Sequence, residues 1–414
     1  MEREAAQRLV AEAAREVRRG SLDEGAHGSH VIALVNAILD TALAEEASDI
    51  HLEPVSGGLR VRLRVDGLLQ ERPVRFPLEL APVIVARLKV MAGIDTAKRN
   101  RPQDGQIRYR RGGRSIDMRV AVLPVVDGER MVVRIMDAED HFLSCAELGF
   151  TARNQELFEQ LIRRPTGLLL LCGPMNSGKT TTLYAALSAL NDPTCHIMTL
   201  EDPVERRIEG ISQFQVNPEA GLTFVAGLRA ALRQDAQKIL LGEIRDRETA
   251  EMAVRIALTG HALFSTLHTE DTISAIFRMI EMGVPPYLLA ATLSGVIAQR
   301  LVRRVCVHCR EVYAVPADSR ERVQLGDLYQ DGMELVRGRG CDHCHGTGYR
   351  GRMAIHEVLP ISARIRTAIL GAGDQEVLRR VAAEEAVETL WQDGVAKAFT
   401  GETTLAEVGR ALYG

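Results

Sequence analysis

The chain has 414 residues, a formal net charge of −4, 46% hydrophobic residues and 26% charged residues. This composition is typical of a folded globular protein, and it excludes disordered, collagen-like and generally basic nucleic-acid-binding chains. At roughly 100–200 residues per domain, the length allows about two to four domains. The charged N-terminus lacks a secretory signal, and the longest uncharged stretch, Gly283–Gln299, is too short to span a bilayer comfortably. We expect a cytoplasmic protein that is peripheral at a membrane through partners.

The N-terminal part of the chain combines helical and strand patterns. Apolar residues recur at helical spacing from Val31 to Ala42, which predicts a helix. Alternation predicts half-buried strands at Leu59–Val65 and Ile116–Val122, and a returning strand follows at Met131–Met136 after an Asp-Gly turn. Three segments are predicted: a helical remnant at 1–30, an α+β, PAS-like domain with antiparallel strands at 31–145, and a linker at 146–160.

From Gly167 onward, apolar strands alternate with helices, which is typical of an α/β fold with a parallel sheet. The candidate strands are Leu168–Cys172, His196–Leu200, Ile239–Leu241 and Ala262–Thr266. Three more segments are predicted: an α/β domain at 161–300, a cysteine-bearing insert at 301–358 and a helical region at 359–414.

The segment Gly173–Thr180 fits the pattern G-x-x-x-x-G-K-[ST] of a phosphate-binding loop. A strand precedes it and a helix follows it, and this context favours a nucleotide site over a chance match in a turn. The backbone N–H groups would surround the phosphates of ATP, Lys179 would reach the β- and γ-phosphates, and Thr180 would hold Mg²⁺. The binding candidates are Gly173, Pro174, Met175, Asn176, Ser177, Gly178, Lys179, Thr180 and Thr181.

Acidic and histidine side chains follow the later strands. Glu243 ends an apolar strand, where it would lie beside Mg²⁺ or the attacking water, and Glu201 ends another. His261 and His268 flank a third strand. Singly, such carboxylates often cap helices and such histidines are usually structural. Their occurrence on successive strands after a phosphate loop indicates a catalytic site.

Four of the seven cysteines form two CxxC pairs, Cys306 with Cys309 and Cys341 with Cys344. Two such pairs predict a structural Zn²⁺ held by four thiolates, and the odd total argues against a secreted disulfide framework. Haem attachment is an alternative, because Cys341–His345 reads CxxCH, but it requires export. A redox dithiol is another alternative, but it would not need two pairs.

Several motifs together resemble the ATPases of type II secretion and type IV pilus assembly (GspE/PilB-like proteins), from about Ser48 to the C-terminus. The resemblance implies a RecA-like P-loop ATPase domain, preceded by a smaller α+β domain and followed by a tetracysteine zinc insert and a helical tail. The segments that carry it are Arg101–Gly105, Gly128–Arg134, an Asp box at Leu200–Glu205, a Walker B region at Leu232–Asp246 and a His box at Leu258–Thr269.

The resemblance also implies a function. Family members are hexameric motors that hydrolyse ATP and drive pseudopilus or pilus assembly from the cytoplasmic face, with inner-membrane platform proteins as partners. ATP would lie between the two domains, with Arg119 and Arg134 at its γ-phosphate. His268 would sense or position that phosphate, and Glu243 and Glu201 would divide the base duties and the positioning of Mg²⁺ and water. The extra N-terminal docking domain of long members would be missing or reduced to residues 1–30.

Strand register gives separate support for the two arginines. If the turn is Val125–Gly128, Arg119 and Arg134 fall directly opposite each other. Like charges paired in this way are destabilising, so the pair favours an anion such as a triphosphate. The alternative is that both arginines pair with local carboxylates such as Asp117 or Glu129.

Departures from the family pattern leave other functions open. Met175-Asn176 replaces the usual Thr-Gly, and Gln237 lies where an Asp-Pro-Asp motif is usual. These departures make a nucleotide-binding scaffold with weak hydrolysis one alternative, and a RecA-like DNA translocase is a separate, third one. The basic stretch Lys98–Arg114 has only Tyr109 for base stacking, so anionic lipid is a better partner for it than nucleic acid.

Overall fold

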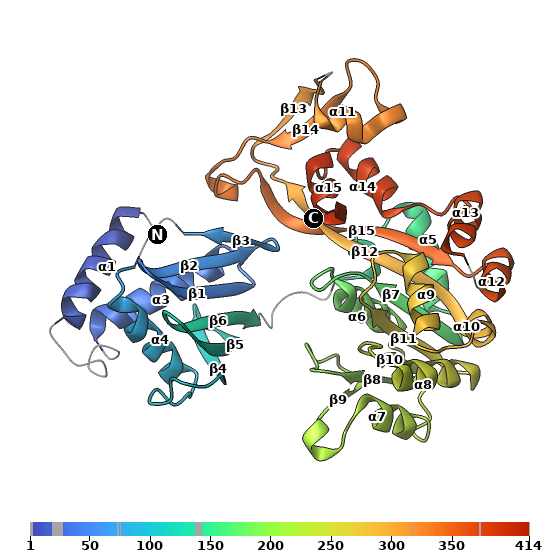
Figure 1. The fold of residues 1–414 in the computed structure, drawn as a ribbon, viewed down its shortest axis with the longest axis horizontal. Helices are drawn as coiled ribbons and strands as arrows, with labels where there is room; N and C mark the ends of the chain where they lie inside the picture. Colours follow the sequence, from blue (N-terminus) through green and yellow to red (C-terminus); the bar gives the residue numbers. More distant parts are fainter. Residues whose placement is uncertain are drawn as a thin grey trace. The chain divides into compact units, whose positions relative to one another are not determined.

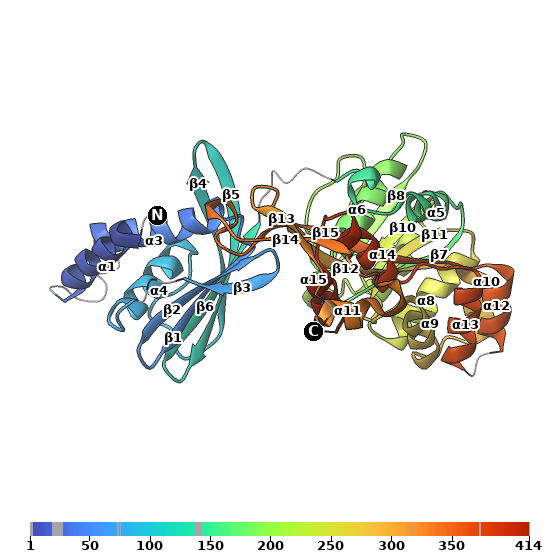
Figure 2. The same cartoon turned by 90° about the horizontal axis from the view of Figure 1, so that it is seen from above.

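The computed structural model of the chain describes residues 3–18, 28–72, 74, 76–136, 143–316, 318–371 and 374–413. The chain divides into two compact units, Met1–Asp140 and His141–Gly414, named here the N-terminal and C-terminal units. Figures 1 and 2 show each unit from two directions. Within the described ranges, no helix is both long enough and apolar enough to cross a membrane.

The N-terminal unit is a six-stranded antiparallel sheet with helices over one face (Figure 2). The strands run in the order β3-β2-β1-β6-β5-β4. Alternate apolar residues, such as Met118 and Val120, are buried in the same core as the side chains of α3 and α4, and the polar positions between them form the other face. The elements are α1 (Arg3–Val17), α3 (Ser29–Ala44), β1 (Asp49–Val55), β2 (Gly58–Val65), β3 (Leu68–Glu71), α4 (Leu80–Met91), β4 (Gln103–Arg111), β5 (Arg114–Val125) and β6 (Gly128–Met136).

The C-terminal unit is built on a seven-stranded sheet in the order β15-β12-β7-β11-β10-β8-β9. Neighbouring strands from β12 to β9 are parallel, and β15 is antiparallel to β12. The strands are β7 (Gly167–Cys172), β8 (Ile197–Glu201), β9 (Ser212–Gln215), β10 (Lys238–Leu241), β11 (Ala262–Leu267), β12 (Leu293–Val305) and β15 (Tyr349–Pro360).

Helices cover both faces of this sheet. Leu168 and Leu170 of β7 are buried in a core with side chains of α8 and α9, whereas Leu169 and Leu171 are buried with side chains of α5 and α6. Burial on both faces explains why these strands are continuously apolar. The helices are α5 (Ala152–Ile162), α6 (Lys179–Leu190), α7 (Phe224–Ala231), α8 (Arg247–Leu258), α9 (Thr272–Glu281), α10 (Pro286–Thr292), α12 (Ala363–Leu370), α13 (Gln375–Glu384), α14 (Leu390–Phe399) and α15 (Leu405–Tyr413).

The predicted fold class is confirmed, because a P-loop α/β unit with C-terminal helices follows a smaller α+β unit. Two predicted boundaries differ from the structure. Residues 146–160, expected as a linker, contain most of α5, since Phe158 and Leu161 of that helix are buried in the core. The C-terminal part of the expected insert 301–358 belongs to β15, which pairs with β12 in the main sheet.

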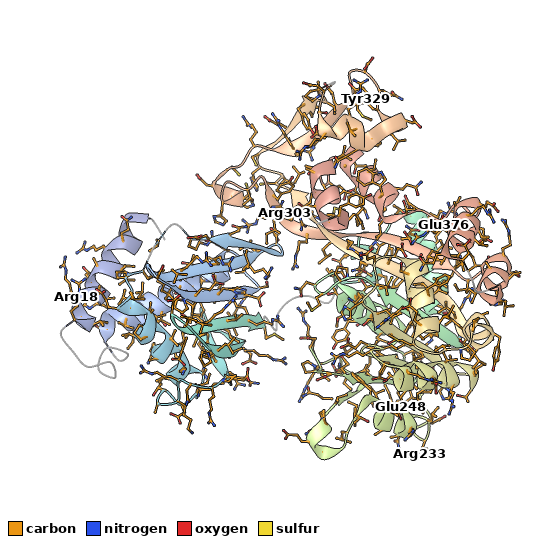
Figure 3. The ribbon with its side chains drawn as sticks, viewed as in Figure 1. Arg18, Arg233, Glu248, Arg303, Tyr329 and Glu376 are labelled. Carbon is orange, nitrogen blue, oxygen red and sulfur yellow. The ribbon has the colours of Figure 1, made fainter. Side chains whose placement is uncertain are left out.

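The insert between β12 and β15 therefore covers residues 306–348 (Figure 1). It contains β13 (Arg310–Ala314), which pairs with β14 (Glu334–Gly338), and α11 (Arg320–Leu325). Arg303 of β12, labelled in Figure 3, lies 4.0 Å from the centre of the Tyr349 ring and forms an ion pair of 2.8 Å with Glu407 of α15. Helix α15 is thus linked through Arg303 to β12 and β15 at the place where the insert leaves and rejoins the main sheet.

Candidate functional site

The loop Gly173–Gly178 joins the end of β7 to the start of α6. Its backbone has positive φ at Gly173 (153°), Asn176 (62°) and Gly178 (85°). Asparagine adopts such angles more readily than most residues, so Asn176 fits a position where glycine is usual. A loop of this form before a helix N-terminus directs several N–H groups toward one point, which is an anion-binding arrangement.

Lys179 begins α6 and directs its ammonium group into this loop. Nζ donates hydrogen bonds to the carbonyl oxygens of Gly173 at 2.7 Å and Pro174 at 2.8 Å. The residue is 8% exposed, and this burial lowers the pKa of Lys179 to about 8, although Cys172 and Glu243 oppose the shift. Among the described residues no carboxylate pairs with Lys179, so a phosphate would supply the missing counter-charge.

Glu243 and His268 lie together at the carboxyl ends of two adjacent parallel strands, β10 and β11. The His268 Nε2 and Glu243 Oε2 atoms are 3.3 Å apart, and the Arg245 guanidinium pairs with Glu243 Oε1. Burial raises the pKa of the Glu243 carboxyl, but Arg245 and His268 outweigh this effect and hold its pKa below the ordinary value. Glu243 is therefore an ionised carboxylate at the edge of the sheet where ligands bind.

Glu201 has a different environment from Glu243. It is 4% exposed and accepts hydrogen bonds from the hydroxyls of Tyr184 and Thr199 and from Gln213 Nε2 at 3.3 Å. Burial and the Glu201 carboxylate raise the pKa of the Tyr184 phenol above its ordinary value, so the phenol stays a donor. The donors to Glu201 are neutral, and they tie β8 to α6 and β9.

The remaining predicted residues of this unit fall in two places. Thr180 and Thr181 are exposed in the first turn of α6, beside the loop. His261 precedes β11 and Gln237 precedes β10, so both lie at the opposite end of these strands from His268 and Glu243. Gln237 Oε1 accepts a hydrogen bond of 2.8 Å from the backbone of His196. The unusual Gln237 therefore has a backbone-binding role away from the phosphate loop.

Arg119 and Arg134 are directly opposite each other on β5 and β6, as the predicted register requires. Arg134 Nε donates to Asp49 Oδ1 at 3.1 Å, and the buried Asp49 also pairs with Arg64 at 3.4 Å. Within the described part of the N-terminal unit, Arg119 has no carboxylate partner and is exposed. One of the two guanidinium groups is thus anchored and the other is open to an anion.

The local carboxylates expected as alternative partners bind other residues. Asp117 pairs with Arg108 at 3.1 Å, and Glu129 pairs with the buried Lys89. In the described part of the unit, neither of these two acids is therefore the partner of Arg119 or Arg134, and the local carboxylate that does pair with Arg134 is Asp49. The partner of Asp117 is its cross-strand neighbour on β4, whereas the partner of Glu129 is a lysine of helix α4.

The four predicted metal-binding cysteines come together in the insert. Their Sγ atoms all lie within 4.8 Å of one another. Four thiolates at about 2.3 Å from a tetrahedral Zn²⁺ would lie roughly 3.8 Å apart. The observed distances are 3.9 Å for Cys306 to Cys341, 3.8 Å for Cys309 to Cys344 and 3.8 Å for Cys341 to Cys344. The donor set therefore fits zinc.

Sequence reasoning missed two residues of β12: Gln299, which contacts the phosphate loop, and its neighbour Arg300. Gln299 is 2% exposed, and its Nε2 donates to Ser177 O at 2.8 Å. Arg300 is 7% exposed and donates to the carbonyl oxygens of Gln299 and Glu270. The one signal in the sequence is that the Gln-Arg pair stands between the apolar segments 296–298 and 301–302 of β12, because buried polar side chains require specific partners.

Comparisons with known proteins identify the relatives of this chain. The family described as Type II/IV secretion system protein matches residues 24–410. The chain is 48% identical to the type II secretion system protein E of Pseudomonas aeruginosa, over 92% of this chain and 75% of that protein. It is 42% identical to the type IV pilus assembly ATPase PilB of Thermus thermophilus, over 90% of this chain and 42% of that protein.

Solved structures share the fold. The Legionella pneumophila ATPase DotB has a TM-score of 0.69 at 20% identity and covers 91% of this chain and 95% of its own. The pilus retraction motor PilT, solved with bound ADP, has a TM-score of 0.61 at 26% identity and covers 90% of this chain and 95% of its own. The phosphate loop, the family match and the curated relatives thus agree, and the chain belongs to the type II/IV secretion system protein family.

Proposed function

We propose that this chain is a hexameric ATPase that powers pseudopilus or pilus subunit assembly in a type II secretion or type IV pilus machine. The observation that most strongly supports this function is the position of Lys179. It is a buried cation without a carboxylate partner among the described residues, inside a loop at the carboxyl end of β7. Glu243 and His268 lie at the same end of the neighbouring strands. This arrangement supports phosphate binding and water activation at one edge of the sheet.

The environments of the two acidic residues support a division of roles. Glu243 is ionised, partly exposed and paired with His268, so we assign it to positioning Mg²⁺ and activating the attacking water. Thr180 would hold the same Mg²⁺, which would neutralise charge on the β- and γ-phosphates. Glu201 is buried beneath three neutral donors, so we assign it to positioning α6 against β8.

Arg119 and Arg134 are assigned as the arginines that stabilise charge on the γ-phosphate. Two guanidinium groups in a directly opposed pair repel each other, and an anion relieves that repulsion. Asp49 fixes Arg134 through Nε and leaves its terminal nitrogens for the phosphate. An arginine supplied to a phosphoryl-transfer site is worth a large part of the rate acceleration.

The cysteine cluster would hold one structural Zn²⁺, which cross-links the two ends of the insert. We further propose a cytoplasmic location at the inner membrane through platform proteins, with the basic residues of 98–114 as a contact for anionic lipid head groups. Two of the three unusual residues that suggested the weak-hydrolysis scaffold fit their positions, since Asn176 adopts the φ that the loop requires and Gln237 lies at the far end of β10.

The test is the steady-state release of phosphate from Mg-ATP by the wild-type chain and by Lys179→Ala. We expect Lys179→Ala to lose about a hundredfold or more in rate, because the charge that meets the phosphates is removed. Lys238→Ala is the matched control, since Lys238 lies at the start of β10 away from the loop. Equal rates in wild type and Lys179→Ala would contradict the proposal, and stimulation by DNA would favour the translocase instead.

A further inference from the structure

Gln299 has a buried side chain, and both the donor and the acceptor of its amide form hydrogen bonds with the phosphate loop and the helix that follows it. Nε2 donates to Ser177 O at 2.8 Å, and Oε1 accepts from the Thr182 hydroxyl of α6 at 2.7 Å. Burying an amide costs free energy unless such partners are present, so this side chain is specific to its two partners. The last parallel pair of β12 with β7 is Ala298 with Cys172, which places Gln299 directly beside the loop.

The hydrogen bond to Ser177 sets the orientation of one peptide unit. A peptide bond is planar and trans, so a carbonyl oxygen that points toward Gln299 forces the N–H of Gly178 to point the opposite way. The phosphate loop packs closely against Gln299. A Cβ on Gly178 would lie 2.7 Å from Gln299 Nε2, and a Cβ on Gly173 would lie 2.5 Å from Gln299 O. Gln299 therefore fixes the part of the loop that precedes Lys179.

Arg300 extends this contact to a second segment. Its guanidinium donates to Gln299 O at 3.1 Å and to Glu270 O at 2.7 Å. Glu270 lies two residues after His268, in the connection from β11 to α9. Among the described residues Arg300 forms no ion pair, so its bonds to these carbonyl oxygens are what hold it in place. The connection that carries His268 is thus tied to the strand that supports the phosphate loop.

We propose that Gln299 and Arg300 are positioning residues for ATP hydrolysis. Gln299 holds the phosphate loop in its binding conformation, and Arg300 holds the His268 segment at a fixed place relative to that loop. The inference rests on the proposed nucleotide-binding function. It assigns different consequences to the two residues: loss of Gln299 weakens binding of the nucleotide, whereas loss of Arg300 slows the chemical step while the nucleotide still binds.

The test compares three loop-side variants, Gln299→Leu, Gln299→Glu and Thr182→Val. We measure the Kd for ADP, kcat and KM for Mg-ATP, and Tm for each. Gln299→Leu is expected to weaken ADP binding by about tenfold or more, because Ser177 O and Thr182 lose their buried partner. Gln299→Glu keeps the acceptor for Thr182 but loses the donor to Ser177, and it is expected to weaken binding more than Thr182→Val.

Thr292→Val is the matched control, since Thr292 carries a buried hydroxyl that bonds within α10. For the second residue, Arg300→Met is expected to lower kcat about tenfold with the Kd for ADP changed less than twofold, and Arg300→Lys is expected to recover part of kcat. Arg366→Met is its control, because Arg366 also donates to a backbone carbonyl oxygen but lies on α12.

Outcomes that lower Tm in the variants and controls alike, with Kd, KM and kcat unchanged, would overturn the inference. If Gln299→Leu does not fold, the inference is tested by the ADP affinities of the other two variants, and it is overturned if Gln299→Glu does not weaken binding more than Thr182→Val. A wild-type chain that binds ADP but does not hydrolyse ATP would contradict the proposed function alone, and the Gln299 comparison would still be read from Kd. A wild-type chain that binds no nucleotide would contradict both.

Discussion

At the scale of single residues, the two strand-end carboxylates have different tasks despite similar positions in the sequence. Glu243 is paired with a histidine and an arginine at the sheet edge, whereas Glu201 is buried and bound by neutral donors. We expect Glu243→Gln to lower kcat by about a hundredfold with ADP affinity retained, since general-base and water-positioning groups contribute at this level.

Glu201→Gln gives the comparison for that prediction. Its main expected effect is a lower Tm, because an amide cannot accept all three hydrogen bonds that the carboxylate accepts. Unfolding curves and phosphate-release rates for both variants separate the roles. A Glu201→Gln chain that keeps wild-type Tm and loses hydrolysis would reverse the assignment.

The pKa of Lys179 predicts a pH dependence of nucleotide affinity. Burial lowers this pKa to about 8, so the ammonium is charged below pH 8 and becomes neutral above it. Phosphate binds the charged form, and ADP affinity should therefore be constant at low pH and fall as the pH rises through about 8. Binding titrations from pH 6.5 to 9.5 measure this directly. Lys179→Arg serves as the control, since arginine stays charged and should flatten the profile between pH 8 and 9.5.

At the scale of elements, helix α15 is fixed to β12 by one buried carboxylate. Glu407 is 1% exposed, pairs with Arg303 at 2.8 Å and also pairs with Arg410. Burial raises the pKa of Glu407, but the two arginines outweigh this effect and bring its pKa below the ordinary value. The pairing therefore stabilises the fold above the unfolded-state pKa, and the stabilisation is lost as the pH falls through the folded-state pKa.

Replacing this carboxylate should cost stability in a pH-dependent way. We expect Glu407→Gln to lower the free energy of unfolding by about 2 kcal/mol at pH 7, since it removes the buried carboxylate that pairs with the half-buried Arg303 and with the more exposed Arg410. The deficit should shrink as the pH falls below about 4.5, where the wild-type carboxylate also becomes protonated in the unfolded chain. Urea unfolding at pH 7, 5 and 4 provides the measurement. A deficit that is independent of pH would show that packing, not charge, is responsible.

The zinc insert gives a second element-scale prediction. Its Val315, Leu325 and Leu335 side chains are buried together with Val395 and Leu405 of the C-terminal helices. We expect one Zn²⁺ per chain by elemental analysis, and we expect Cys309→Ser to lose the metal and to lower Tm by several degrees. Cys195→Ser is the matched control because Cys195 lies outside the cluster. A chain purified without chelators that holds no zinc would contradict the assignment.

The secondary structure was predictable to the extent that local pattern controls it. The strands β7, β10 and β11 consist mostly of apolar residues because the sheet is buried on both faces, and the register of Arg119 with Arg134 follows from a short turn. The boundary between the units was less predictable, because α5 looks polar in sequence and its burial depends on contacts with distant residues. The extent of the insert was missed for the same reason, since β15 pairs with β12 across the whole insert.

The residues of the candidate site differ in the same way in how far the sequence predicts them. Lys179, Glu243 and the four cysteines lie in short contiguous motifs whose chemistry depends on local spacing, and sequence is sufficient to find them. Gln299 and Arg300 lie near the phosphate loop because β12 pairs with β7, so the polar Gln-Arg pair in the sequence does not by itself show which residues it contacts. The partner of Arg134 was missed likewise, because Asp49 becomes its neighbour through the pairing of β1 with β6.

At the scale of the whole molecule, we propose an ATP-driven motor whose rate of hydrolysis depends on the loop that contains Lys179 and on assembly of the chains. The most direct measurement is phosphate release from Mg-ATP as a function of chain concentration, with the mass of the assembly determined in the same samples by light scattering. We predict that activity per chain rises as a six-subunit assembly forms, and that Lys179→Ala assembles to the same mass without activity. Equal activity in wild type and Lys179→Ala, or full activity in a chain that stays monomeric, would contradict the account.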